Sequence, residues 1–227
     1  MRFELGDRIL ERLREAFTPS SEEFVALSAR KGGDPFRVLV AVIISQNTNE
    51  RNAFEAFRRL GSTVGLTPDA ILRAGADAVR EAIKPAGLQD SKSTAIVEAA
   101  RIAVEKYGGG MRRLLELGEE AVRRELTAVS GIGYKTVDVL LASFGYPVLP
   151  VDTHVRRVAR RLGLSESSSY LGIRRDLEQV FRPEVRFEAH LLLIKLGREV
   201  CKAREPRCAD CPLKDLCAYY RAQPRGA

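Results

Sequence analysis

Residues 126–154 read LTAVSGIGYKTVDVLLASFGYPVLPVDTH, and their pattern predicts two helices joined by a glycine-rich turn. Within this stretch, Gly131-Ile132-Gly133 separates two patterns of helical periodicity, at 119–126 and 134–143. A G-x-G turn that opens a helix exposes consecutive backbone N–H groups at the positive end of the helix dipole, and this arrangement binds phosphate. A tight connection between two helices has the same appearance. Lys135 and Asp152 follow the turn and add candidate chemistry.

The chain has four cysteines, and all of them lie near its end, at Cys201, Cys208, Cys211 and Cys217. Their spacing is C-x6-C-x2-C-x5-C. Two disulfides packed this tightly would remove little loop entropy, so the spacing favours one site of four thiolates on a metal. Four thiolates bind zinc or an iron–sulfur cluster, and the spacing alone leaves both open.

Taken together, these motifs resemble the endonuclease III branch of the helix-hairpin-helix (HhH-GPD) DNA glycosylase superfamily. Lys135 stands where that branch carries its nucleophile, Asp152 stands where the family carries an essential aspartate, and the cysteine spacing equals the branch's [4Fe–4S] motif. The resemblance covers roughly residues 28–220. It includes the apolar run at 38–44 with the polar loop that follows it, and also Gly87-Leu88.

The resemblance implies an all-α fold of two helical domains with a DNA cleft between them. A six-helix barrel with the helix-hairpin-helix would occupy 28–146. A discontinuous cluster domain would be formed by 1–27 and 147–227. The periodicity of apolar residues independently predicts helices and little or no sheet. The expected helices are 6–17, 35–45, 50–60, 69–84, 90–107, 118–129, 134–144, 153–162, 172–181 and 186–199.

The resemblance also implies the activity, a base excision repair DNA glycosylase with AP-lyase activity that removes damaged, oxidised pyrimidines from duplex DNA. The target nucleotide must be flipped out of the helix, at a cost of a few kcal/mol. Lys135 would then attack C1′, displace the base and leave a Schiff base that permits β-elimination. A carboxylate at Asp152 would stabilise positive charge developing at the sugar. Asp152 also reads as a helix N-cap, and the two roles are compatible.

Further residues are candidates for binding DNA. All three asparagines of the chain lie between 47 and 52, which makes 46–52 the most amide-rich stretch, and amides can replace the hydrogen bonds of an extruded base. Asn47, rather than Gln46, stands where the family usually has its inserting glutamine, so the sequence does not settle which of them enters the stack. Leu88 would be an apolar wedge on the opposite strand. Gly131 and Gly133 would bind phosphate.

Basic residues flank the proposed chemistry. Three of them, Lys202, Arg204 and Arg207, lie between the first two cysteines, and four arginines at 156, 157, 160 and 161 share one helical face after Asp152. We expect both groups to follow a DNA backbone. His154, two residues after Asp152, is a candidate for lining the cleft.

Composition agrees with a DNA partner, because the formal net charge is +7 and the pI is about 9.4. The expected partner is double-stranded DNA with a damaged base or an abasic site, and we expect a monomer. No run of 18 apolar residues predicts a membrane span. The N-terminal stretch carries acids and an amphipathic repeat rather than a secretory signal, so we expect an intracellular protein of the cytoplasm or nucleoid.

Two alternatives stay open at this point. One is a mismatch-specific uracil or thymine DNA glycosylase of the same fold, although such relatives carry a tyrosine at the nucleophile's own position, and this chain has lysine there. The other is a non-catalytic helix-hairpin-helix DNA-binding module with a structural zinc.

Overall fold

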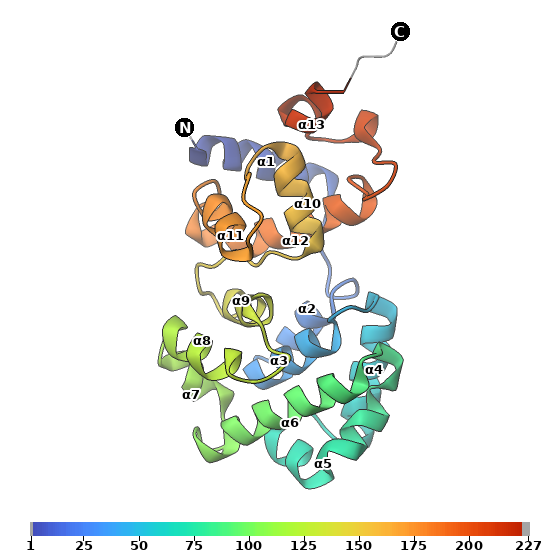
Figure 1. Ribbon diagram of the computed structural model, residues 1–227, viewed down its shortest axis with the longest axis vertical. Helices are drawn as coiled ribbons and strands as arrows, with labels where there is room; N and C mark the ends of the chain where they lie inside the picture. Colours follow the sequence, from blue (N-terminus) through green and yellow to red (C-terminus); the bar gives the residue numbers. More distant parts are fainter. Residues whose placement is uncertain (1, 224–227) are drawn as a thin grey trace. The chain divides into compact units, whose positions relative to one another are not determined.

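The computed structural model describes residues 2–223, and these residues form α-helices and short 3-10 helices with no β-strand (Figure 1). The all-α prediction is confirmed. The chain forms two compact units: Ser20–Tyr146, which we call the hairpin unit, and the chain on either side of it, which we call the cysteine unit. No helix in the described part of the chain is long and apolar enough to cross a membrane.

The sequence predicts a first domain boundary at residue 28, whereas the hairpin unit begins at residue 20. The difference has a local cause. A short helix, α2 (Val25–Arg30), follows directly after the boundary and packs against α3 (Pro35–Ile44), so it belongs with the helices that come after it. The second boundary, between 146 and 147, lies within the loop that follows the hairpin.

The hairpin unit is built around α3. Asp34 caps this helix by accepting from the backbone N–H of Phe36 at 2.9 Å, and Pro35 occupies its first turn. Every residue of α3 except Arg37 is buried, as expected for a helix surrounded by others. The remaining helices of the unit are α4 (Glu50–Thr63), α5 (Pro68–Ala82), α6 (Gln89–Glu105), α7 (Met111–Glu116), α8 (Glu119–Thr127) and α9 (Tyr134–Ser143), with the 3-10 helix η1 (Lys84–Ala86) before α6.

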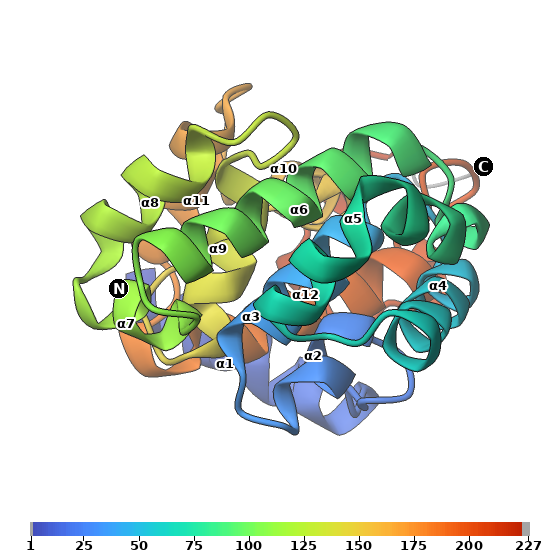
Figure 2. The ribbon, with the colours of Figure 1, turned by 90° about the horizontal axis from the view of Figure 1, so that it is seen from below.

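Helices α4, α6 and α9 all pack against α3, and α5 lies beside α6 (Figure 2). The predicted single helix at 69–84 is interrupted, because Gly75 adopts φ +78° inside α5. This left-handed conformation favours glycine and breaks the helical hydrogen bonding at that point. The two loops that the sequence predicts to contact DNA follow the end of α3 and precede the start of α6.

The cysteine unit packs α12 (Arg186–Glu199) against α1 (Arg2–Ala16) and α10 (Thr153–Leu162). A Cβ at Gly6 would lie 2.0 Å from the carbonyl oxygen of Val180, so the N-terminal helix approaches the C-terminal part of the chain more closely than any side chain would permit. The unit also contains α11 (Tyr170–Glu178), α13 (Ala218–Arg221) and the 3-10 helices η2 (Pro183–Val185), η3 (Cys208–Asp210) and η4 (Lys214–Leu216).

Candidate active site and metal centre

The hairpin between α8 and α9 has the geometry of an anion-binding turn. Gly131 adopts φ +89°, which favours glycine, and Ile132 anchors the turn with 3% exposure. Gly133 caps α9, accepting from the backbone N–H groups of Thr136 and Val137 at 3.0 and 3.2 Å. A Cβ at Gly133 would meet nothing within 4 Å, so packing within the unit does not require glycine there. The turn therefore leaves its outer side open to a ligand.

A buried ion pair fixes the two hairpin helices to each other. Asp138 on α9 is fully buried, and its Oδ1 lies 2.5 Å from Nη2 of Arg123 on α8. Arg123 also donates to Glu119 through two nitrogens, at 2.9 and 2.7 Å. Breaking a buried pair by removing one partner typically costs about 3–5 kcal/mol, so this contact holds the hairpin angle firmly.

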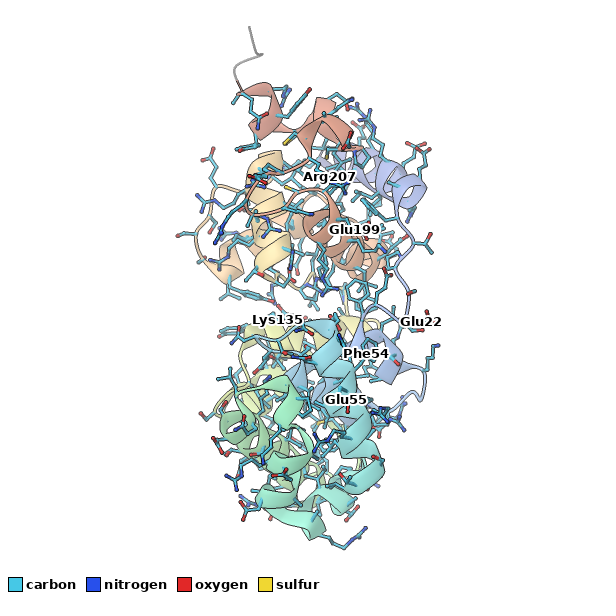
Figure 3. All side chains as sticks on the ribbon, turned by 90° about the vertical axis from the view of Figure 1, so that its right-hand side faces the viewer. Glu22, Phe54, Glu55, Lys135, Glu199 and Arg207 are labelled. Carbon is cyan, nitrogen blue, oxygen red and sulfur yellow. The ribbon has the colours of Figure 1, made fainter. Side chains whose placement is uncertain are left out.

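Lys135 is the second residue of α9, directly after the glycine-rich turn, and its side chain is half-buried (Figure 3). Tyr134 before it is exposed. The positive end of the helix dipole is concentrated in this first turn. Gly131, Gly133 and Lys135 thus come together at one end of one helix, as the sequence predicts.

The structure distinguishes the two neighbouring amides after α3. Gln46 donates from Nε2 to the carbonyl oxygen of Gly131 at 3.0 Å and to Oγ1 of Thr136 at 2.9 Å, so its amide is bound to the hairpin. Asn47 is exposed and adopts φ +50°. This left-handed region is sparsely populated, although asparagine enters it more readily than most residues with a side chain.

Leu88 shares this strained conformation, with φ +51°, and it is 56% exposed. It is the N-cap position of α6. A large apolar side chain presented to solvent on a strained backbone gains nothing from packing, and such outliers concentrate at functional sites. Asn47 and Leu88 are the only residues other than glycine with positive φ in the described part of the hairpin unit.

Asp152 is held in place by the chain on both of its sides. Its Oδ1 accepts from the backbone N–H of Val155 at 2.7 Å, so it is the N-cap of α10, and its side chain is half-buried. The extended segment 147–151 before it has no strand partner. Side chains satisfy its backbone instead: Arg186 donates to the Pro147 carbonyl, Glu178 accepts from Leu149 N–H, His190 lies 2.9 Å from the Pro150 oxygen, and Tyr170 bonds Val151 N–H.

His154 is the second residue of α10 and contacts Arg157, with 3.1 Å between Nδ1 and Nη2. Burial lowers the pKa of His154 below its ordinary value, while the Asp152 carboxylate acts in the opposite direction. Gly197 permits this arrangement, because a Cβ there would lie 2.8 Å from the His154 Cβ. His154 is therefore a half-buried residue between α10 and α12.

The four cysteines line one cavity in the cysteine unit. Burial is the main cause that raises the pKa of the Cys208 and Cys211 thiols, and the neighbouring cysteines raise both further. The other residues that line the cavity are apolar, aromatic or basic, with no carboxylate or imidazole among them. Within residues 2–223, no three potential ligand side chains stand close enough together to hold a single metal ion.

This donor set fits an iron–sulfur cluster. Four soft thiolates are the ligands that such clusters use. Three basic residues, Arg161, Arg207 and Lys214, also line the cavity and would offset the negative charge of thiolate ligands. The sequence leaves zinc and a cluster open, and the donor type alone, four thiolates, is common to both.

Two arginines of α10 hold the loop that contains the first cysteine. Arg157 donates to the carbonyl oxygens of Cys201 and Gly197, each at 2.8 Å. Arg161 donates to the Cys201 sulfur at 3.3 Å and to the carbonyl oxygens of Lys202 and Ala203 at 2.6 and 3.0 Å. The sequence predicts DNA contacts for these two arginines together with Arg156 and Arg160, whereas the structure shows Arg157 and Arg161 bonded to the cysteine loop.

The loop between the first two cysteines is exposed and basic. Lys202, Arg204 and Arg207 all lie at the surface, but Arg207 also donates from Nη2 to the carbonyl oxygen of Glu199 at 2.7 Å (Figure 3). Lys202 and Arg204 are thus the loop's more available cations. Glu205, between Arg204 and Arg207, adopts φ +49°, which shows how tightly the loop turns.

The predicted residues fall into two sets. The hairpin unit carries Lys135, the two glycines, Gln46, Asn47 and Leu88, whereas the cysteine unit carries Asp152, His154, the cysteines and the basic loop. Sequence reasoning missed the roles of Arg157, Arg161 and Asp138. An i, i+4 pair of arginines or an aspartate in an apolar helix is a usable signal, but neither indicates which segment covers it.

Comparison with known proteins places these features in a family. A sequence model described as HhH-GPD superfamily base excision DNA repair protein matches residues 40–183. Endonuclease III of Sulfolobus acidocaldarius is 36% identical over 221 residues, covering 96% of this chain and 97% of that protein.

Solved structures agree with the sequence comparison. A non-covalent endonuclease III–DNA complex matches with a TM-score of 0.77 and 29% identity, covering 94% of each chain. A trapped endonuclease III–DNA covalent intermediate matches with a TM-score of 0.71 and 30% identity, covering 83% of this chain and 85% of that one. The chain therefore belongs to the HhH-GPD superfamily of base excision DNA repair proteins, in its endonuclease III branch.

Proposed function

We propose that this base excision repair DNA glycosylase and lyase removes oxidised pyrimidines from duplex DNA, with Lys135 as its nucleophile. The observation that carries the proposal is the place of Lys135 in the first turn of α9, directly after the open G-x-G turn. A phosphate bound at that turn would bring a sugar close to the amine.

The reaction has three steps. The neutral amine of Lys135 attacks C1′, the N-glycosidic bond breaks, and the base leaves with its electron pair and takes up a proton. The attached nitrogen then gives up one proton, its lone pair expels O4′ from C1′, and O4′ takes up a proton, which leaves a ring-opened iminium. This iminium makes the 2′ hydrogen acidic, so loss of that proton breaks the C3′–O3′ bond and expels the 3′ phosphate by β-elimination. The positive end of the α9 dipole disfavours an ammonium ion, which helps to keep the amine neutral.

Asp152 would stabilise the positive charge that develops on the sugar as the base departs. Four side chains fix the segment before it, and its own N-cap bond to Val155 fixes its carboxylate. One Asp152 oxygen serves this cap, and the second is available to face a substrate. His154, two residues further along, would line the same site as a neutral side chain.

Insertion into the duplex falls to Asn47 and Leu88 in this proposal. The Gln46 amide is occupied by the hairpin, which favours Asn47 as the residue that replaces the extruded base. Gln46 then ties the inserting loop to the turn that holds the phosphate. Leu88 would wedge into the opposite strand.

The four cysteines would bind a [4Fe–4S] cluster. When bound, the cluster would connect Cys201 and Cys208, which stand at the two ends of the basic loop. The four thiolates would supply all of its protein ligands. Lys202 and Arg204 would contact DNA phosphates. Arg207 would add positive charge to the loop while it stays bonded to the Glu199 carbonyl oxygen. We propose that the protein acts as a monomer on chromosomal DNA in the cytoplasm or nucleoid.

Borohydride trapping tests the proposal. Wild-type protein incubated with duplex DNA carrying an oxidised pyrimidine should give a covalent adduct after reduction, and Lys135→Ala should give none while still binding DNA. Lys106→Ala is the matched control, because Lys106 is an exposed lysine paired with Glu125. Wild-type protein that removes a base without ever being trapped would identify a monofunctional glycosylase instead. A panel of lesion duplexes then defines the preferred base.

A further inference from the structure

Lys92 is buried in the hairpin unit, although lysine is among the residues least often buried. It lies in the first turns of α6 and is 2% exposed. Its ammonium group donates to two backbone carbonyl oxygens, those of Ile44 and Ala86, each at 2.9 Å. One cation thus bridges two segments that are far apart in sequence.

The two carbonyls occupy equivalent places. Ile44 is the last residue of α3 and Ala86 is the last residue of η1. The last carbonyl oxygens of a helix receive no hydrogen bond from an N–H group of that helix, so each needs a donor from elsewhere. A cation also suits the negative end of the α3 dipole.

Each carbonyl stands at the base of a loop with a strained tip. Asn47 follows Ile44 by three residues, Leu88 follows Ala86 by two, and their φ angles are +50° and +51°. The backbone N–H of Lys92 also donates to the Leu88 carbonyl at 3.1 Å, but this is the first helical bond of α6, so only the ammonium contacts depend on lysine. Strained residues persist only where their surroundings fix them.

An apolar side chain would fill this space at lower cost. Burial lowers the pKa of Lys92 to about 8, which reflects the penalty for a charge removed from water. A buried lysine that carries this cost supplies something that a leucine or methionine does not. Here that is a pair of hydrogen bonds at a fixed separation.

We propose that Lys92 is a positioning residue that couples the two DNA-inserting loops, so that Asn47 and Leu88 enter the duplex at the same base pair. The inference rests on the proposed function of those loops. Catalysis is sensitive to such placement, since a displacement of about 1 Å can cost on the order of 10²-fold in rate.

The test compares two substrates with Lys92→Met, which keeps an unbranched side chain one atom shorter and removes the charge and donors. The first is a duplex with an oxidised pyrimidine and 2-aminopurine beside it, whose fluorescence reports insertion. The second is a single-stranded abasic oligonucleotide, which needs no insertion. We expect roughly tenfold slower excision with a lost fluorescence rise on the duplex. Trapping on the single strand should stay within about twofold, because the hairpin and Lys135 are untouched.

Lys195→Met is the matched control, because Lys195 is a buried lysine in the cysteine unit that pairs with Glu199 at 3.2 Å. It should leave the ratio of the two activities unchanged. A Lys92→Met protein that matches wild type on the duplex overturns the inference, and so does an equal loss on both substrates. Failure of wild type to trap at all would instead contradict the proposed function.

Two further measurements cover a variant that does not fold. Lys92→Arg keeps the charge but shifts the donors, and a loss confined to the duplex supports the coupling, whereas an equal loss or none overturns it. Combining Lys92→Arg with Leu88→Ala should raise the activation free energy of duplex excision by less than the sum of the two single effects, since both residues act through one loop. Additive losses would show that Lys92 acts elsewhere.

Discussion

Arg157 donates from Nε to the carbonyl oxygen of Cys201 at 2.8 Å, so the helix capped by Asp152 is bonded directly to the first of the four cysteines. The same guanidinium contacts His154 and the Gly197 carbonyl. Three segments of the cysteine unit therefore meet at one side chain: the start of α10, the end of α12 and the loop that follows it. The position of Asp152 and the position of the cysteine loop depend on each other.

Replacing Arg157 with methionine should lower the free energy of unfolding by about 1–3 kcal/mol, because two half-buried carbonyl oxygens lose their donor. Urea denaturation monitored by circular dichroism measures the change. Arg160→Met on the same helix is the control, since Arg160 is exposed, and it should stay within about 0.5 kcal/mol of wild type. Equal stability of the two variants would show that the Arg157 bonds contribute nothing.

Asp152→Asn keeps the N-cap and removes the charge, so base excision should fall on the order of 10²-fold or more while stability changes little. Single-turnover excision on a lesion duplex gives the rate. Asp34→Asn is the matched control, because Asp34 caps α3 in the same way, with 2.9 Å to the Phe36 N–H. If both variants excise at nearly the wild-type rate, Asp152 is only a helix cap.

How far the sequence predicts this structure depends on the length of each element. The long amphipathic helices, such as α1 and α4, fill several turns, so their apolar periodicity is visible. The helices α2, α7 and α13 contain six, six and four residues, and fewer than two turns cannot display a period. Tertiary contacts, rather than local pattern, determine them.

The candidate site shows the same division. Motif and spacing predict Lys135, Asp152 and the cysteines, because backbone turns and metal ligands require particular residues at particular intervals. Arg157 and Arg161 were assigned to DNA because periodicity places them on one face with Arg156 and Arg160. Periodicity alone does not indicate which neighbouring segment packs against that face. Choosing between Gln46 and Asn47 likewise required the hydrogen bonds that Gln46 makes to the hairpin.

His154 should make stability depend on pH. Its pKa in the folded protein lies below the ordinary value of about 6.5, because burial disfavours the imidazolium. The unfolded chain therefore binds the proton more readily. The contribution to stability is complete above pH 6.5 and is lost as the pH falls through the lower folded pKa.

Urea unfolding of wild type and His154→Asn at pH 7 and pH 5 checks this sign. We expect wild type to lose more of its unfolding free energy between these pH values than the variant loses. His190→Asn provides the comparison, because it leaves His154 in place and should preserve the His154 contribution to the pH dependence. An identical fall with pH in wild type and His154→Asn would contradict the expectation.

The basic loop should contribute to DNA affinity through counterion release. Each phosphate contact adds about 0.9 to the slope of log K against log salt, so Lys202→Ala combined with Arg204→Ala should lower the slope by nearly two for any sequence. Fluorescence anisotropy on an undamaged duplex measures this slope between roughly 50 and 200 mM salt, where the electrostatic contribution is large.

Arg207→Ala should have a smaller effect on the slope and a larger one on stability, because Arg207 is bonded to Glu199. The exposed pair Lys31→Ala and Arg73→Ala, in the hairpin unit, is the charge-matched control and should leave the slope unchanged. If the loop variant and this control give the same slope, the loop does not touch the DNA backbone, and the cysteines hold it for another reason.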